Sequence, residues 1–175
     1  MSKDTELEEM VSSSQADGKA DQSPVRFIDG YLAYLLAQAS SRVSREFHRE
    51  VEATGLSVTE WRVLASLAGS EGESIGALSQ LALTKQPTLS KVVQRMERDG
   101  LVTRRGIRKD RRQTLVCIAP RGLSLTEPLL TRAMQHQAAV LEPFGQGNGE
   151  MLVDMLRQLL ALHPPEGLPE PDADK

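Results

Sequence analysis

The residues best suited to chemistry lie between Lys85 and Arg121, where cations and hydrogen-bonding side chains gather. This segment holds eleven Lys or Arg and three acids, a local net charge of +8. The whole chain carries −3, so the remainder carries −11. A basic segment in an otherwise acidic chain is typical of a nucleic-acid site. The alternative is a solvated surface whose cations only keep the protein soluble.

A helix and a hairpin are predicted within this basic segment. The apolar positions of residues 86–98 have the spacing of one helical face: Leu89, Val92, Val93 and Met96. Asp99-Gly100 suits the end of that helix. Two strand-like runs follow at 101–105 and 113–118, joined by a cationic tip over 106–112. This order is typical of a winged helix-turn-helix, whose second helix enters the major groove while the hairpin reaches the backbone or minor groove.

Direct contacts to DNA are expected from both parts. Gln suits adenine, Lys suits guanine and the Thr methyl suits thymine, and the expected helix contacts are Gln86, Thr88, Ser90, Lys91 and Gln94. Arg95 is expected to hold a phosphate, with pairing to Asp99 as the alternative. The expected contacts of the hairpin tip are Arg108, Lys109, Asp110, Arg111 and Arg112. Phosphate would repel Asp110, so its expected task is to orient a neighbouring arginine.

The rest of the chain must position this surface. A long helix is expected from about Asp29 to Ala53, and a capping box of Ser57 and Glu60 opens the next helix. Ser74 is expected to cap a short helix that turns into the Gln86 helix, which completes a helix-turn-helix. Helices are also expected over 123–141 and 150–162, and Pro128 predicts a kink or a fresh helix start.

Composition bounds the class of protein. The length of 175 residues predicts one compact domain with ragged ends, and 39% hydrophobic residues are enough to bury a core. No run reaches the length of a membrane span and no signal-like segment is visible, so a cytoplasmic location is expected. The single cysteine, Cys117, excludes an intrachain disulfide. Packing is its predicted role, with redox sensing as the alternative because its neighbourhood is basic.

Several of these residues resemble the MarR family of bacterial transcription regulators. The most specific matches are Leu89-Ser90, Glu97 through Arg104, Asp110-Arg111-Arg112 and Ala119 through Gly122. The resemblance spans about 27–162 and includes the family's Asp-x-Arg at Asp110 and Arg112, which implies that Arg112 enters the minor groove. The family's Leu-Thr-x-x-Gly is altered, since Ile118-Ala119 replaces Leu-Thr, and the cap of the following helix is therefore expected to differ.

The resemblance also implies an organisation. Members are homodimers whose first and last helices intertwine, so a small β-hairpin wing would stand on a mainly α-helical dimer. The expected domains are a disordered acidic tail over 1–25, an N-terminal dimerisation helix over 26–55, a winged helix-turn-helix over 56–119, C-terminal dimerisation helices over 120–163 and a disordered tail over 164–175. The expected partners are an operator in double-stranded DNA, a second copy of the chain and a small-molecule effector.

The effector implied by the resemblance is an anionic aromatic molecule or an acyl-CoA that releases a repressor from DNA. The family's pocket lies where the dimer helices meet the winged domain, and the candidate ligand-binding residues there are Arg45, His48, Trp61 and Arg62. Ordinary roles stay open for each, namely solvated arginines, a surface histidine and a core tryptophan.

Two rivals come from other classes. An enzyme is disfavoured because the sequence shows no nucleophile motif, no glycine-rich phosphate loop and no Cys/His metal spacing, so no cofactor and no metal are expected. A winged-helix module used only for protein contacts is the other rival, and it would not need the six cations between Arg104 and Arg112.

Overall fold

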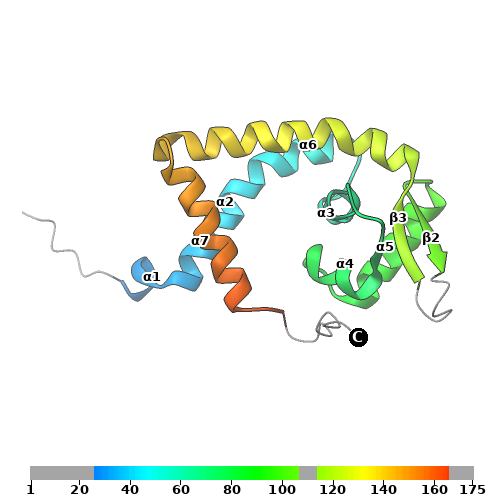
Figure 1. Ribbon diagram of the computed structural model, residues 1–175, viewed down its shortest axis with the longest axis horizontal. Coiled ribbons are helices and arrows are strands. Elements are labelled where there is room, and N and C mark those ends of the chain that lie inside the picture. The colour runs from blue at the N-terminus through cyan, green and yellow to red at the C-terminus, as the bar shows by residue number, and fades with distance from the viewer. Residues whose placement is uncertain (1–25, 107–113, 166–175) are drawn as a thin grey trace, which may run out of the picture. The chain divides into compact units, whose positions relative to one another are not determined.

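The computed structural model describes residues 26–106 and 114–165. The chain divides into two compact units, one up to Ser41 and one from Arg42 onward. Figure 1 labels the main helices and strands and colours them by residue number. The described elements are α1 (Phe27–Gly30), α2 (Leu32–Ala53), α3 (Val58–Leu67), β1 (Glu73–Ser74), α4 (Ile75–Leu81), α5 (Gln86–Arg98), β2 (Val102–Gly106), β3 (Thr114–Ile118), α6 (Pro120–Leu141), a 3-10 turn (Glu142–Phe144) and α7 (Asn148–Leu162). These elements confirm the predicted class, mainly α-helical with a small antiparallel sheet.

In the first unit, one prediction about the long N-terminal helix is wrong. A single helix from about Asp29 was expected, but Tyr31 adopts an extended backbone with ψ of 111° and separates α1 from α2. Gly30 is a weak helix former at this point. Arg26 precedes the short α1 and forms an ion pair within its first turn, since its guanidinium lies 2.9 Å from a carboxylate oxygen of Asp29. The Phe27 and Tyr31 rings stack with centroids 4.9 Å apart.

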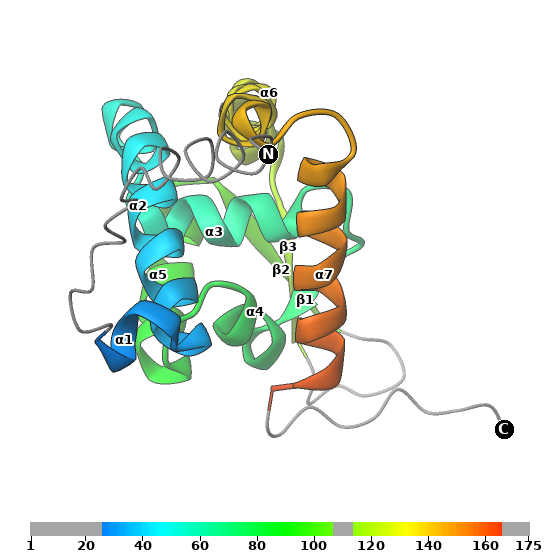
Figure 2. The ribbon, with the colours of Figure 1, turned by 90° about the vertical axis from the view of Figure 1, so that its left-hand side faces the viewer.

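The helix-turn-helix of the second unit comprises α3, α4 and α5 (Figure 2). The predicted capping box is present: the Ser57 backbone N–H donates to Oε2 of Glu60 at 2.8 Å, and the Glu60 N–H donates to the Ser57 hydroxyl. Ser74 caps α4 as predicted, since its hydroxyl accepts from the Ala77 N–H. The predicted end of α5 is also confirmed, because Asp99 is its C-cap and Gly100 has a φ of +73°.

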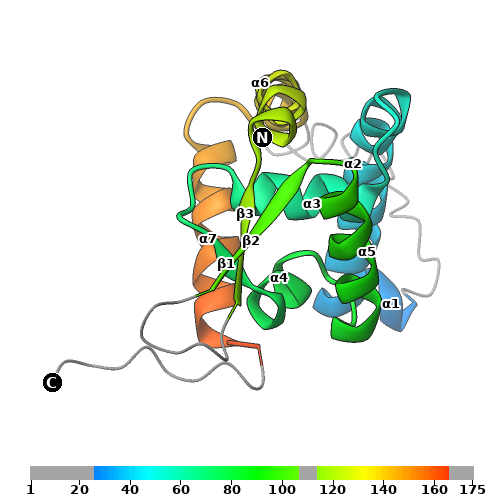
Figure 3. The same cartoon turned by 90° about the vertical axis from the view of Figure 1, so that its right-hand side faces the viewer.

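The sheet has the strand order β1-β3-β2 and is antiparallel throughout (Figure 3). Val102 pairs with Ile118 and Gly106 with Thr114, so the predicted hairpin strands are correct to within one residue. The two-residue β1, which pairs Glu73 with Val116, was not predicted. The cationic tip predicted between the strands lies outside the described residues.

The hydrophobic core lies in the second unit. Its buried side chains come from the end of α2, from α3, α4 and α5, from the sheet and from Leu129 on α6. The members with no exposed surface are Val51, Val63, Leu64, Leu67, Leu78, Ala82, Leu89, Val93, Met96 and Val116. Three of these, on α5, belong to the predicted apolar face, whose fourth member, Val92, is half-buried. Packing therefore fixes which face of α5 stays in solvent.

Helix α6 differs from its prediction at two points. It begins at Pro120, three residues before the expected start, because Pro suits a first turn. Pro128 lies inside the continuous helix and starts no new one. Gly122 lies in the first turn of α6, where a Cβ would lie 2.1 Å from the Leu101 carbonyl oxygen, so only glycine lets α6 approach this closely.

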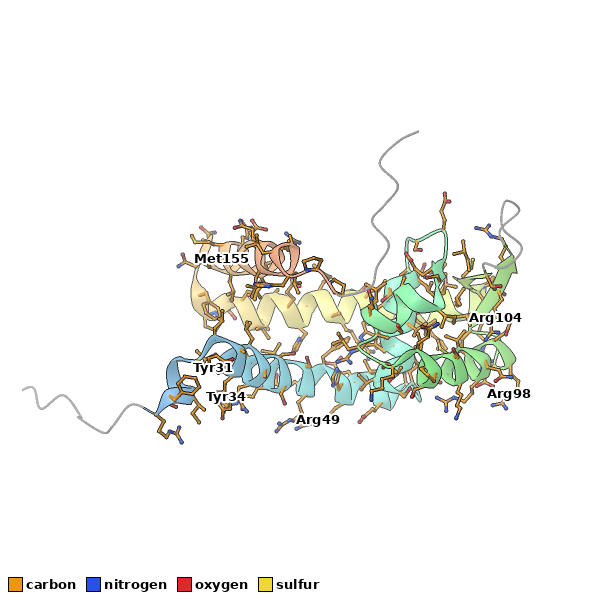
Figure 4. All side chains as sticks on the ribbon, turned by 90° about the horizontal axis from the view of Figure 1, so that it is seen from below. Tyr31, Tyr34, Arg49, Arg98, Arg104 and Met155 are labelled. Atoms are coloured by element: carbon orange, nitrogen blue, oxygen red, sulfur yellow. The ribbon has the colours of Figure 1, made fainter. Side chains whose placement is uncertain are left out.

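The interruption predicted after α6 is present. A 3-10 turn over Glu142–Phe144 is followed by Gly145 and Gly147, both with positive φ, before α7 begins. Helix α7 exposes several large apolar side chains, including Met155 (Figure 4).

Candidate nucleic-acid interface

The outer face of α5 carries the predicted DNA contacts. Gln86, Thr88, Lys91, Gln94 and Arg95 are all exposed, whereas Ser90 is half-buried. Four of them line one open hollow of the surface together with Val92 and Arg98: Thr88, Lys91, Gln94 and Arg95. The structure therefore presents amide, hydroxyl, ammonium and guanidinium groups together on a helix whose other face is fully packed. Such groups suit base edges and phosphates.

Arg95 pairs with Glu60 and not with Asp99, which was the alternative partner expected from the sequence. Its Nη2 and Nε donate to Oε1 of Glu60 at 2.9 and 3.2 Å. Glu60 is buried at the start of α3, so this ion pair joins α3 to the middle of α5. The Arg95 side chain is 48% exposed, and a phosphate contact from the same side chain stays a prediction.

The environment of Glu60 keeps its carboxylate charged. Burial alone would raise the pKa of Glu60, but the Ser57 N–H, the Ser57 hydroxyl and the Arg95 guanidinium together lower it. Each donor favours the ionised form by a hydrogen bond, and Arg95 adds its charge. Glu60 is thus an anion at neutral pH, and its carboxylate holds the Arg95 guanidinium of α5 in place.

Other cations near α5 have partners in the fold. The Arg121 Nη1 donates to the Asp99 carbonyl oxygen at 2.7 Å, so the start of α6 closes the end of α5. Arg104 lies 3.3 Å from Glu97, and Arg105 donates to the Glu71 carbonyl oxygen. Arg98 is 74% exposed, 3.5 Å from Asp99; it lies at the same end of the second unit as Arg104 (Figure 4). Arg98 is therefore better placed than Arg104 to meet a phosphate.

The hairpin-tip candidates are Arg108, Lys109, Asp110, Arg111 and Arg112, and all five lie outside the described residues. The strands on either side are described, and they place the two ends of the tip next to each other at the Gly106–Thr114 pair.

The candidate effector residues fall into two kinds. Trp61 is buried and packs edge-on against Phe47 with ring centroids 5.4 Å apart, which is the core role that the sequence left open. Arg45 is exposed and His48 is half-buried. Burial, and then the Arg62 charge, lower the pKa of His48, while Glu52 opposes them. His48 and Arg62 are thus close enough for their charges to interact, and a second cation there is disfavoured.

Two residues with notable surroundings were not predicted. Glu60 was identified only as a cap, because its second partner is 35 positions away. His136 on α6 packs against Phe47, and its Nε2 lies 3.8 Å from a Glu46 carboxylate oxygen. That nitrogen is buried and has no hydrogen-bond partner among the described residues. No sequence motif marks His136, which shares a helix with ordinary core residues.

Cys117 has a packed environment. Its thiol donates to the Glu71 carbonyl oxygen at 3.4 Å, and a Cβ on Gly72 would lie 2.7 Å from the sulfur. These contacts agree with the packing role predicted for it. Over residues 26–106 and 114–165, no cluster of three or more His, Cys, Asp or Glu is arranged to hold a metal ion. None of the helices in this part of the chain could span a membrane.

Known proteins resemble this chain in sequence and in fold. The MarR family sequence profile matches residues 54–113. The crystal structure of a MarR family transcriptional regulator from Silicibacter pomeroyi DSS-3 is 36% identical, covers 78% of this chain and 98% of its own, and has a TM-score of 0.70.

Curated relatives include an activator and repressors. The transcriptional activatory protein BadR of Rhodopseudomonas palustris is 33% identical over 56% of this chain and 58% of its own length. The HTH-type transcriptional repressor IacR of Pseudomonas putida is 36% identical over 54% and 56%. The chain thus spans little more than half the length of these two relatives. The homoprotocatechuate degradative operon repressor of Escherichia coli is 27% identical over 75% of this chain and 88% of its own.

These relatives are named as transcription regulators and not as enzymes. The structural match covers nearly the whole of the Silicibacter pomeroyi regulator at 36% identity, and the family profile covers the helix-turn-helix and the first strand of the hairpin. The chain belongs to the MarR family of transcription regulators.

Proposed function

We propose that this chain is a cytoplasmic repressor that binds an operator in double-stranded DNA as a homodimer and is released by a small effector. The observation that carries the proposal is the face of α5, where Lys91, Gln94 and Arg98 are exposed opposite a fully buried apolar face. That arrangement presents donors and acceptors that suit DNA on the solvent face of a helix held by its packed face. IacR and the Escherichia coli relative are named repressors and BadR is named an activator, so two of these three relatives support repression.

The proposed contacts divide by position along α5. Gln86, Thr88, Lys91 and Gln94 read base edges, and Arg98 holds a phosphate. The half-buried Ser90 contacts the backbone at the groove edge. Arg95 positions α5 through Glu60 and meets phosphate with its exposed part. The tip residues Arg108, Lys109, Arg111 and Arg112 contact the backbone and the minor groove, and Asp110 orients one of them.

A gel shift on the DNA upstream of its own gene tests this proposal. Lys91→Ala or Gln94→Ala should weaken binding by about 1–3 kcal/mol and relax base preference at one position of each half-site. Arg157→Ala, shown by sedimentation to dimerise like wild type, is the matched control, because it removes an exposed cation of α7 that pairs only with Asp154 among the described residues. Equal binding by wild type and Lys91→Ala would refute the assigned role of α5.

The homodimer is supported by apolar side chains that solvent would not favour. The large ones exposed on α7 are Met151, Met155, Leu156, Leu160 and Leu162. In the first unit, Tyr31 and Tyr34 are also exposed (Figure 4). Exposed apolar surface of this kind marks protein contacts. Sedimentation should give a dimer, and half-sites should lie about 10 base pairs apart. A monomer that still binds DNA with full affinity would exclude the dimer.

We propose an anionic aromatic molecule, or its CoA thioester, as the effector. Arg45 and Arg62, which follows Trp61 in α3, carry positive charge, and an anion bound beside them would offset the Arg62 charge that lowers the pKa of His48, so that His48 could bind the anion in its charged form. The Escherichia coli relative is named for homoprotocatechuate degradation, and homoprotocatechuate is an aromatic acid. The effector would favour a dimer whose recognition helices are spaced wrongly for DNA.

Trp61 is the only tryptophan, so its fluorescence reports effector binding. Aromatic acids should bind the protein alone more tightly than the protein with operator DNA, by the same factor that they weaken DNA binding. A hundredfold coupling equals about 2.7 kcal/mol. Equal affinity with and without operator would show that this binding carries no signal.

A further inference from the structure

The turn between α4 and α5 contains a leucine in a backbone conformation that leucine rarely adopts. Leu83 has a φ of +53° and is the one non-glycine residue with positive φ over residues 26–106 and 114–165. Its N–H donates to the Gln80 carbonyl at 3.0 Å, and the Thr84 N–H donates to the Ser79 carbonyl at 2.9 Å. This pair of bonds is the Schellman helix ending, in which Gly or Asn usually occupies the position of Leu83.

Packing does not account for a leucine at this place. The Leu83 side chain is 77% exposed, so it adds little to the core while its Cβ strains the backbone. The adjacent Ala82 is fully buried, and its carbonyl oxygen accepts from Thr84 and from Arg62. These contacts hold the turn in one conformation. The turn therefore presents an apolar side chain to solvent in a fixed direction, at a cost in stability.

The position of Leu83 indicates what covers it. Lys85, two residues on, is the N-cap of α5, and Gln86 opens the exposed polar face of that helix. Strained, exposed residues persist where a function uses them. We propose that Leu83 is an apolar DNA contact, packing on deoxyribose or on a thymine methyl beside the first base pair met by α5. This inference rests on the proposed DNA binding and adds a residue that charge and hydrogen bonding do not reveal.

Substitution of Leu83 separates the fold from DNA binding. Leu83→Asn removes the apolar contact and relieves the strain, so it should raise the Tm by a few degrees while weakening DNA binding about five- to tenfold. Leu83→Ala keeps a Cβ, so it should lose affinity similarly with little change in Tm. Because the contact releases no counterion, neither variant should change the dependence of affinity on salt. Leu81→Ala, an exposed leucine in ordinary helical backbone, is the control and should change affinity less than twofold.

The titration uses the full chain and the labelled duplex upstream of its own gene. Replacing thymines by deoxyuridine removes the thymine methyls and so distinguishes the two surfaces. If Leu83 contacts a methyl, the replacement weakens DNA binding by wild type and leaves the affinity of the Leu83→Ala variant unchanged. If Leu83 contacts the sugar, the replacement leaves the affinity of wild type unchanged as well. Unchanged DNA affinity in Leu83→Asn and Leu83→Ala would overturn the inference. So would a loss of self-association instead, which would make a second copy the occupant. Absence of DNA binding by wild type would overturn the proposed function itself, a distinct result.

Discussion

Replacing Glu60 by glutamine tests how α5 is held against the rest of the fold. The buried carboxylate accepts from the Ser57 N–H at 2.8 Å, from the Ser57 hydroxyl at 2.7 Å and from two nitrogens of Arg95. Glutamine has nearly the same shape but keeps only one acceptor oxygen. Its amide would therefore point two donors at either Ser57 or Arg95, and one set of bonds must be lost.

The size of the effect follows from these two sets of bonds. The cap at the start of α3 contributes about 1 kcal/mol. The Arg95 pair contributes up to about 1 kcal/mol, because Arg95 is half exposed and solvent screens it. With the unmatched donors included, we expect Glu60→Gln to lower the free energy of unfolding by about 2 kcal/mol. For a chain of this length, that is a fall in Tm of about 4–8 °C.

Urea unfolding followed by Trp61 fluorescence measures this difference at several pH values. The pKa of Glu60 is lowered in the folded state from its ordinary 4.5. Its contribution is therefore fully present above pH 4.5 and is lost as the pH falls through the folded-state pKa. Wild type and Glu60→Gln should differ at neutral pH and converge in acid.

Glu97→Gln is the matched control, because Glu97 pairs with Arg104 at the surface, where both side chains are more than a third exposed. It should cost less than about 1 kcal/mol. Equal stability of Glu60→Gln and wild type at neutral pH would refute the assigned role of Glu60. A difference that persists unchanged in acid would show that the carboxylate charge is not its source.

Two further predictions concern the close approach of α6 and the charge of His48. Gly122→Ala would place a methyl 2.1 Å from the Leu101 carbonyl oxygen, so it should lower the free energy of unfolding by at least about 3 kcal/mol, and an unchanged Tm would show that α6 does not lie there. The folded state lowers the pKa of His48 from 6.5, so the unfolded chain binds more protons and stability is lost as the pH falls below 6.5. Chemical denaturation of His48→Gln should show less of this acid loss than wild type, and identical pH profiles would contradict it.

Local patterns predicted most of the elements near the proposed site. The apolar spacing of α5 and the Ser57–Glu60 box each depend on residues within one or two helical turns, and both are confirmed. The two-residue β1 is too short for any periodicity, so only its pairing with β3 reveals it. The break at Tyr31 was missed because the apolar stripe begins only at Leu32, so the pattern did not define where the helix starts.

Contacts between distant residues could not be predicted. Glu60 and Arg95 are 35 positions apart, and Arg121 lies 22 positions from the Asp99 carbonyl that it binds. Both contacts involve α5, so the sequence predicted this helix but not the residues that hold it in place. The strained backbone of Leu83 depends on the geometry of the turn. It could not be predicted, because nothing in the sequence distinguishes Leu83 from the other leucines.

The dependence of DNA affinity on salt tests the central claim most directly. Anisotropy of a labelled duplex from the upstream region of the gene, titrated with the full chain at several salt concentrations, gives the binding constant at each. If a homodimer contacts around 10 phosphates, log K should fall against log salt with a slope of roughly −9. A slope close to zero would show that the cations of α5 and the hairpin do not meet a phosphate backbone, and would contradict the assignment of this surface to DNA.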